Sequence, residues 1–183
     1  MLSNYSQLIL WAFAAVLMFW AVGAYNRLVS LRNNIARAFV PVDAQIRHRQ
    51  GLIEQWIEAQ RPLLDHTPKA LDAVVAACGQ LQTACDIVRN RPVSSKPVTS
   101  LRVAEDTLTE ARNRLSAELP NRPDVLASLG LAGIGEELAA ADSALGFARQ
   151  QFNQAVQAYN DALQQFPTMM LTGVFRFRLA GTL

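Results

Sequence analysis

Formal charge is absent from the start of the chain. The first 26 of its 183 residues contain no Asp, Glu, Lys or Arg, and the first charged side chain is Arg27. Residues 8–25 are almost uninterruptedly apolar, and as a helix they would span about 27 Å, close to the roughly 30 Å of a hydrocarbon core. A cleaved signal peptide would carry a basic leading region and a small-residue cleavage site, neither of which stands out here. We therefore predict a retained transmembrane helix within residues 1–26, with the lipid bilayer as its partner.

Basic side chains are missing before this apolar run and frequent after it. Arg27, Arg32 and Arg37 follow it directly. Cytoplasmic flanks of membrane helices are enriched in Lys and Arg. The charge asymmetry predicts a single-pass protein with its N-terminus outside and the remaining residues in the cytoplasm.

Residues that carry chemistry are few. The two histidines, His48 and His66, have no second ligand at helical spacing, so no metal site is expected. Cys78 and Cys85 lie roughly 10 Å apart along one helix, too far for a disulfide. A net charge of +2 gives no reason to expect nucleic acid. We expect no enzymatic activity, no catalytic residue and no cofactor.

Apolar residues recur every three or four positions through most of the chain, which is typical of packed helices. Pro41 is expected to kink or break the first helix, which fades near residue 61. The proline- and serine-rich segment 92–100 is predicted to be a loop. The predicted helices after the apolar run cover residues 27–60, 68–90 and 101–119, a short helix at 124–129, and 136–166.

These lengths and short connections predict the topology. The fold class is all-α: an N-terminal transmembrane helix followed by a long, up-down-up-down antiparallel four-helix bundle over residues 27–167. This path returns the chain toward the membrane, so the apolar tail of residues 168–183 is expected close to the bilayer. The tail could place Arg176 and Arg178 on lipid phosphates, pair as a strand with another copy, or be a frayed terminus.

Arg49 occupies a position in the apolar stripe where a hydrophobic residue is expected. A buried arginine needs a carboxylate partner. Asp142 lies in the half of the last helix that faces this part of the first helix. Asp142 is therefore the candidate partner if Arg49 is buried, and an arginine at the edge of the helix, with its stem packed and its head in water, is the other interpretation.

Aromatic–asparagine pairs recur near both ends of the bundle. Phe152 and Tyr159 are seven residues apart and share a helix face, and Asn153 and Asn160 form a polar row beside them. Tyr25-Asn26 lies near the membrane end of the facing helix. The amides could bond across helices and fix their register, or be exposed for another subunit to dock.

Two stretches resemble the LemA family. The first runs from Tyr25-Asn26 to Leu52-Ile53, and the second from Ala148-Arg149 to Phe166-Pro167. His48, Gly51, Glu54 and Phe152 depart from the family pattern. The residues that we single out as structural or interaction candidates are Tyr25, Asn26, Arg49, Asp142, Arg149, Phe152, Asn153, Tyr159, Asn160, Phe166 and Pro167.

The resemblance implies a bacterial protein with an N-terminal membrane segment, an antiparallel helical bundle in the cytoplasm, and no defining enzymatic activity. Relatives include a protein of the magnetosome membrane, and the genes often lie beside those of membrane proteases. We therefore expect a non-enzymatic scaffold at the inner membrane that forms a homo-oligomer. An adaptor or regulator of a membrane protease or other membrane enzyme is the alternative.

Overall fold

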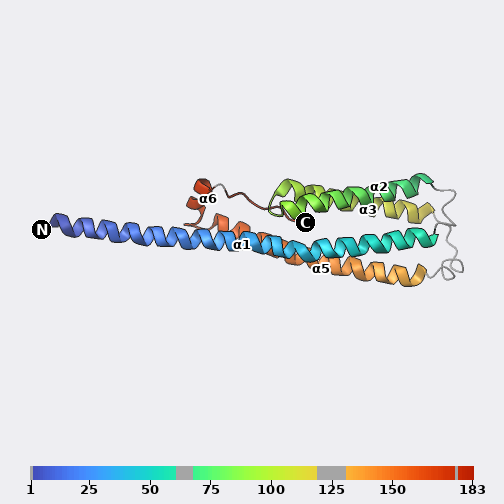
Figure 1. Ribbon diagram of the computed structural model, residues 1–183, viewed down its shortest axis with the longest axis horizontal. Helices are drawn as coiled ribbons and strands as arrows, with labels where there is room; N and C mark the ends of the chain where they lie inside the picture. The colour runs from blue at the N-terminus through green and yellow to red at the C-terminus, as the bar shows by residue number, and fades with distance from the viewer. Residues whose placement is uncertain (1, 61–67, 119–130, 176) are drawn as a thin grey trace.

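The computed structural model describes residues 2–60, 68–118, 131–175 and 177–183. Within these ranges the chain is helical and contains no β-strand. The predicted short helix at residues 124–129 lies outside the described residues. The helices of Figure 1 are α1 (Leu2–Gln60), α2 (Pro68–Asn90), α3 (Ser95–Glu118), α5 (Leu131–Gln164) and α6 (Met169–Phe175).

The long helices form an antiparallel bundle built from two pairs. Helix α1 packs along α5, α2 packs along α3, and contacts between α1 and α2 join the pairs (Figure 1). Arg49 contacts Asp142, and ten residues earlier in α1 Phe39 contacts Phe152, ten residues later in α5. Neighbouring positions therefore run in opposite directions, which confirms the predicted up-down-up-down topology.

The apolar stripes form one continuous core. Phe39, Val42 and Ile46 of α1 are buried against Leu145 and Phe152 of α5. Side chains at three- and four-residue spacing point to one helix face, so each helix buries its apolar stripe against the neighbouring helices. Burial of a large aliphatic or aromatic side chain contributes about 1.5–3 kcal/mol. This repeated burial is the main stabilisation of the bundle.

Pro41 does not break the first helix, so of the two predicted effects, a kink or a break, the break is wrong. Helix α1 is continuous through it from Leu2 to Gln60. A proline inside a helix removes one hydrogen bond and costs about 3 kcal/mol. Phe39 and Val42 on either side are buried in the core, and their packing offsets that cost.

The connection between α2 and α3 is shorter than predicted. The segment 92–100 was expected to be a loop, but α3 already begins at Ser95. Pro97 falls in the first helical turn, where a proline is tolerated because its missing N–H would have no partner in the helix. The turn is closed by the Ser94 N–H, which donates to the Arg91 carbonyl at 3.1 Å.

The first part of α1 extends beyond the bundle as a single helix (Figure 1). Its large apolar side chains between Leu8 and Val22 are 36–77% exposed. Helices α1 and α2 are both long and apolar enough to cross a membrane, but a third of the apolar window of α2 is buried in the bundle. Only in α1 does the most apolar window lie entirely outside the protein core.

The chain turns back after α5. Helix α6 lies beside α1 at the end of the bundle nearest the apolar segment, and Tyr25 packs against Phe175 at a ring-centroid distance of 5.0 Å. Residues 177–183 then run in extended form along the bundle toward the turn between α2 and α3 (Figure 1). The tail is therefore a packed part of the fold, and the expectation of a frayed terminus is wrong for these residues.

Candidate functional site

A cluster of charged side chains lies inside the bundle, where α1, α3 and α5 meet. Arg49 Nε lies 3.1 Å from Asp142 Oδ1, so of the two interpretations of Arg49 the structure shows the buried pair and not the solvated head. Arg49 Nη1 also lies 3.6 Å from Glu105 Oε1, and the guanidinium of Arg149 contacts the other oxygen of Glu105. Arg112 completes the cluster at 3.4 Å from Asp142. The cluster therefore ties three helices together by ion pairs.

Burial sets the electrostatics of this cluster. Arg49 is 5% exposed and Glu105 is 3% exposed. Desolvation lowers the pKa of Arg49, opposed by the charge of Asp142 and reinforced by Arg112. Desolvation and then the neighbouring Arg49 charge lower the pKa of Arg149. An arginine pKa begins so far above neutrality that both groups stay charged at pH 7.

Glu105 was missed in the sequence, although the signal that identified Arg49 applies to it. It lies four residues after Leu101 and three before Leu108, both fully buried, so it occupies a core position of α3. A charge in an apolar stripe indicates a buried partner of opposite charge. Applying that rule to α3 as well as α1 would have found it.

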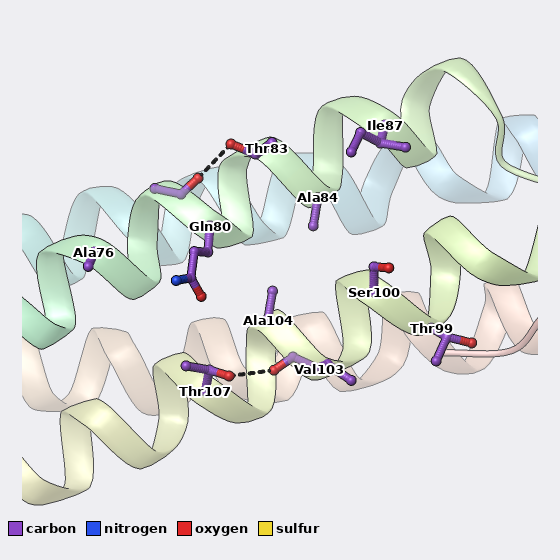
Figure 2. A pocket seen from close by; sticks show the side chains of 11 residues that line it. Ala76, Gln80, Thr83, Ala84, Ile87, Thr99, Ser100, Val103, Ala104 and Thr107 are labelled. Atoms are coloured by element: carbon purple, nitrogen blue, oxygen red, sulfur yellow. Dashed lines mark hydrogen bonds between the residues drawn. The ribbon is translucent and has the colours of Figure 1, made fainter.

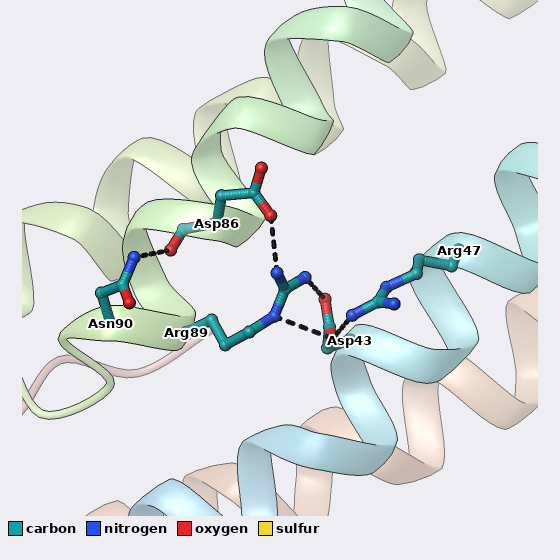
Figure 3. A network of polar contacts seen from close by, with 5 residues as sticks. All are labelled: Asp43, Arg47, Asp86, Arg89 and Asn90. Carbon is teal, nitrogen blue, oxygen red and sulfur yellow. Dashed lines mark hydrogen bonds and ion pairs between the residues drawn. The ribbon is translucent and has the colours of Figure 1, made fainter.

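A second polar network joins α1 to α2 near the end of α2 (Figure 3). The Asp43 carboxylate accepts hydrogen bonds from Arg89 at 2.8 and 3.3 Å and another from Arg47. Arg89 also donates to Asp86 at 2.7 Å. Burial opposes ionisation of Asp43, but the hydrogen bonds and charges of Arg89 and Arg47 outweigh it and lower the pKa of the carboxyl.

The asparagine row binds the C-terminal tail. The Asn160 amide donates to the Ala180 carbonyl at 3.0 Å and accepts from the Ala180 N–H at 2.8 Å. Asn153 makes the same two bonds with Leu183, both at 2.8 Å. The Tyr159 hydroxyl donates to the Arg178 carbonyl at 3.2 Å. We call these three side chains and residues 177–183 the tail clasp.

The tail clasp corrects both sequence interpretations of the row. Asn153 and Asn160 neither bond across helices nor lie free for another subunit, because the chain's own tail occupies them. The spacing explains the fit: seven residues of helix rise about 10.5 Å, and three residues of extended chain span about 10 Å. Each amide therefore meets a main-chain N–H and C=O pair in the way that a neighbouring β-strand would.

Gly181 lets the tail approach the first residue of α3 closely. A Cβ added to it would lie 2.8 Å from Ser95 Cα and 3.3 Å from the Ser95 carbonyl oxygen. Both atoms belong to main chain, so they cannot move aside as a flexible side chain would. Only glycine fits this position while the tail is docked.

The remaining candidates lie apart from these networks or on their edges. Phe152 is fully buried against Phe39, and Tyr159 is 1% exposed. Asn26 is exposed, whereas its neighbour Tyr25 packs on Phe175 and Phe177. Phe166 is 76% exposed, and the Phe166-Pro167 bond is cis.

Thiols and histidines form no site within the described residues. Cys78 and Cys85 are both unpaired, and burial raises the pKa of the Cys85 thiol to about 12. His48 is exposed on α1, and His66 lies outside the described residues. The described part of the chain contains no group of three His, Cys, Asp or Glu that could hold a metal ion.

A groove of about 810 Å³ runs between α2 and α3 on the outer side of that pair (Figure 2). Its walls carry small side chains, including Gly79, Ala84 and Ala104. Thr83 and Thr107 line it too, but their hydroxyls donate to carbonyls of their own helices at 2.9 Å. The groove therefore presents methyl groups and small apolar surfaces, together with the Gln80 amide and the exposed side chains of Ile87 and Val103.

Comparison with known proteins gives one assignment. A family model described as the LemA family matches residues 38–182, which is most of the chain. No curated protein matches.

Proposed function

Since the chain belongs to the LemA family, we propose that it is a non-enzymatic, membrane-anchored scaffold that self-associates at the cytoplasmic face of the bacterial inner membrane. One observation carries the proposal: the apolar start of α1 lies outside the bundle and is continuous with a bundle helix. Because the helix is continuous, the position and tilt of such an anchor in the membrane determine the position and tilt of the bundle.

The exposed apolar segment supports anchoring by its size. Its large side chains from Leu8 to Val22 stay 36–77% exposed in the folded chain. Covering each such side chain is favourable by about 1.5–3 kcal/mol, so the segment as a whole strongly favours a hydrocarbon environment. After expression, the full chain is expected to float with membranes and to resist extraction by alkaline carbonate. Release into the soluble fraction would contradict the anchor.

The basic residues that follow the segment support a cytoplasmic bundle. Arg27, Arg32 and Arg37 are all exposed on α1. In right-side-out spheroplasts, external protease should leave the bundle intact, and in inverted vesicles it should degrade the bundle. The reverse pattern would contradict the orientation but not the anchor.

Self-association is proposed to use the groove between α2 and α3, with a second copy of the chain as the occupant. Groove walls of small residues allow close approach of another helix. Gly79 lines the groove and has open space where a side chain would begin, so the side chain of Gly79→Leu enters the groove with no clash at its Cβ. Gly146→Leu on α5 is the matched control, since Gly146 also faces open space but lies outside the groove.

The first measurement is the mass of the protein extracted in detergent or nanodiscs, with all co-purifying proteins identified. A discrete assembly of this chain alone, dissociated by Gly79→Leu and not by Gly146→Leu, is expected. A monomer with a stoichiometric second protein would contradict the scaffold. It would instead support the alternative, an adaptor or regulator of a membrane protease or other membrane enzyme, for which the same groove offers a place for a partner helix.

A further inference from the structure

We propose that a cavity at the membrane-facing end of the bundle binds the phosphate group of an anionic lipid. The cavity has a volume of about 430 Å³. Its basic side chains come from three separate parts of the chain: Arg32 from α1, Lys96 from the first turn of α3, and Arg178 from the tail. The proposal rests on the membrane anchorage proposed above.

The charge of the cavity favours an anion. Its three ionised side chains are all basic, and no Asp or Glu is among the described residues that line it. Arg32, Lys96 and Arg178 form no ion pair with another described part of the chain. The first turn of α3 also contains no acidic residue, and a helix N-terminus carries partial positive charge. Nothing on the described walls neutralises this concentration of positive potential.

The position of the cavity favours a lipid over a soluble anion. Tyr25 lines it and is the last residue of the apolar run. Arg32 lies about 10 Å further along the axis, and helical side chains tilt toward the helix N-terminus, which here is the membrane side. Its guanidinium therefore extends toward the headgroup region while its stem stays on the protein.

One wall of the cavity is aromatic. Tyr25 packs on Phe175 and Phe177 at ring-centroid distances of 5.0 and 6.0 Å. Phe175 is 47% exposed, and the neighbouring Met169 and Met170 of α6 are 56% and 68% exposed. A basic floor beside an exposed apolar edge matches a phosphate ester that is attached to acyl chains. Inorganic phosphate would use only the basic part.

The tail clasp builds this cavity. The Tyr159 hydroxyl holds the Arg178 carbonyl, and Asn160 holds Ala180 two residues later. These bonds hold the main chain at Arg178, which lines the cavity together with Arg32, so the cavity has this lining only while the tail is docked. The asparagine row and the lipid site are therefore parts of one arrangement.

The test measures lipid binding to the full chain in detergent by native mass spectrometry. Dioleoyl-phosphatidylglycerol is compared with dioleoyl-phosphatidylcholine, which has the same acyl chains and no net charge. A basic residue near an anionic surface changes affinity about fivefold. Arg32→Gln with Arg178→Gln should therefore lower the preference for phosphatidylglycerol by roughly 25-fold. Arg32→Lys should retain most of it, because the charge remains.

The control is Arg27→Gln, which removes an equal charge beside the membrane but outside the cavity. An effect of Arg27→Gln as large as that of Arg32→Gln would mean diffuse attraction to the surface and would overturn the site. Equal binding of the two lipids by the unmodified chain would overturn it as well. Displacement of the lipid by millimolar inorganic phosphate would show that the cavity binds soluble phosphate, and it would overturn the proposal of a lipid ligand.

Failure of the lipid site and failure of the anchor give different results. Lipid preference is measured in micelles and compares variants that share the same α1. A chain that leaves the membrane fraction on carbonate treatment contradicts the anchor whatever its lipid preference. A chain that stays in the membrane but shows no phosphatidylglycerol preference contradicts the cavity alone.

Discussion

The two halves of the polar row on α5, before and after residue 150, use their side chains in different ways. Before it, further from the apolar segment, Asp142 and Arg149 carry charges that pair with α1 and α3. After it, Asn153 and Asn160 are neutral and bind main-chain atoms of the tail. Ion pairs thus join helix to helix, whereas amides join a helix to an extended segment.

This difference follows from what each group can match. A guanidinium reaches carboxylates several ångströms away and suits contacts between side chains of packed helices. A carboxamide has one donor side and one acceptor side, so it complements a peptide group. Buried charges that lose a partner are also far more costly than amides that return to water. The two halves should therefore respond very differently to substitution.

The largest effect is expected from Glu105→Gln. This change keeps the shape of the side chain but leaves Arg49 and Arg149 without their shared carboxylate, and breaking a buried pair costs about 3–5 kcal/mol. The thermal midpoint, followed by circular dichroism in detergent, should fall sharply. Glu110→Gln, which removes an exposed pair with Arg114, should cost less than about 1 kcal/mol. Similar losses in both variants would contradict a special role for the buried cluster.

The tail clasp should respond locally. Asn153→Leu and Asn160→Leu each remove two hydrogen bonds, worth about 1–3 kcal/mol per site. The amide protons of Ala180 and Leu183, which donate to these side chains, should then exchange rapidly with solvent. Gln154→Leu, on an exposed position of the same helix, is the control. Unchanged exchange in the two asparagine variants would show that other contacts hold the tail.

Gly181→Ala tests the close contact between the tail and Ser95 without removing any of the side chains that hydrogen-bond the tail. The added methyl group meets Ser95 main chain at 2.8 Å, so either the tail or the turn must shift. We expect faster exchange at Ala180 with little change in the thermal midpoint. Gly133→Ala provides the comparison, since a Cβ there meets open space. Equal exchange in both variants would mean that the contact with Ser95 relaxes freely.

The smallest effect is expected at the partly exposed network of Figure 3. The pKa of Asp43 is lowered in the folded chain, so its contribution to stability is present above the ordinary carboxyl value of about 4 and is lost as pH falls through the lowered value. The difference in thermal midpoint between the unmodified chain and Asp43→Asn should be constant from pH 6 to 8 and shrink in acid. A difference independent of pH would indicate that packing, not ionisation, accounts for it.

Much of the bundle could be predicted from the sequence, because apolar spacing determines which face of each helix is buried. The same spacing identified Arg49 and named Asp142 as its candidate partner, but it could not decide between that pair and an arginine head in water, because both keep the stem of Arg49 in the stripe. The tail clasp could not be predicted in that way. The match of Asn153 and Asn160 to Leu183 and Ala180 depends on a turn after α5 that reverses the chain and sets the tail extended. Helical periodicity contains no information about that turn.

Continuity of α1 through Pro41 has a mechanical consequence. From Asn26 to Gln60 the helix is roughly 50 Å long, so in a bilayer it would act as a lever with its pivot at the surface. A change of about 10° in the tilt of the anchor would sweep the remote end of the bundle through roughly 9 Å. Changes in bilayer thickness or crowding alter the tilt. They would then cause the largest displacement at the part of the molecule furthest from the lipid.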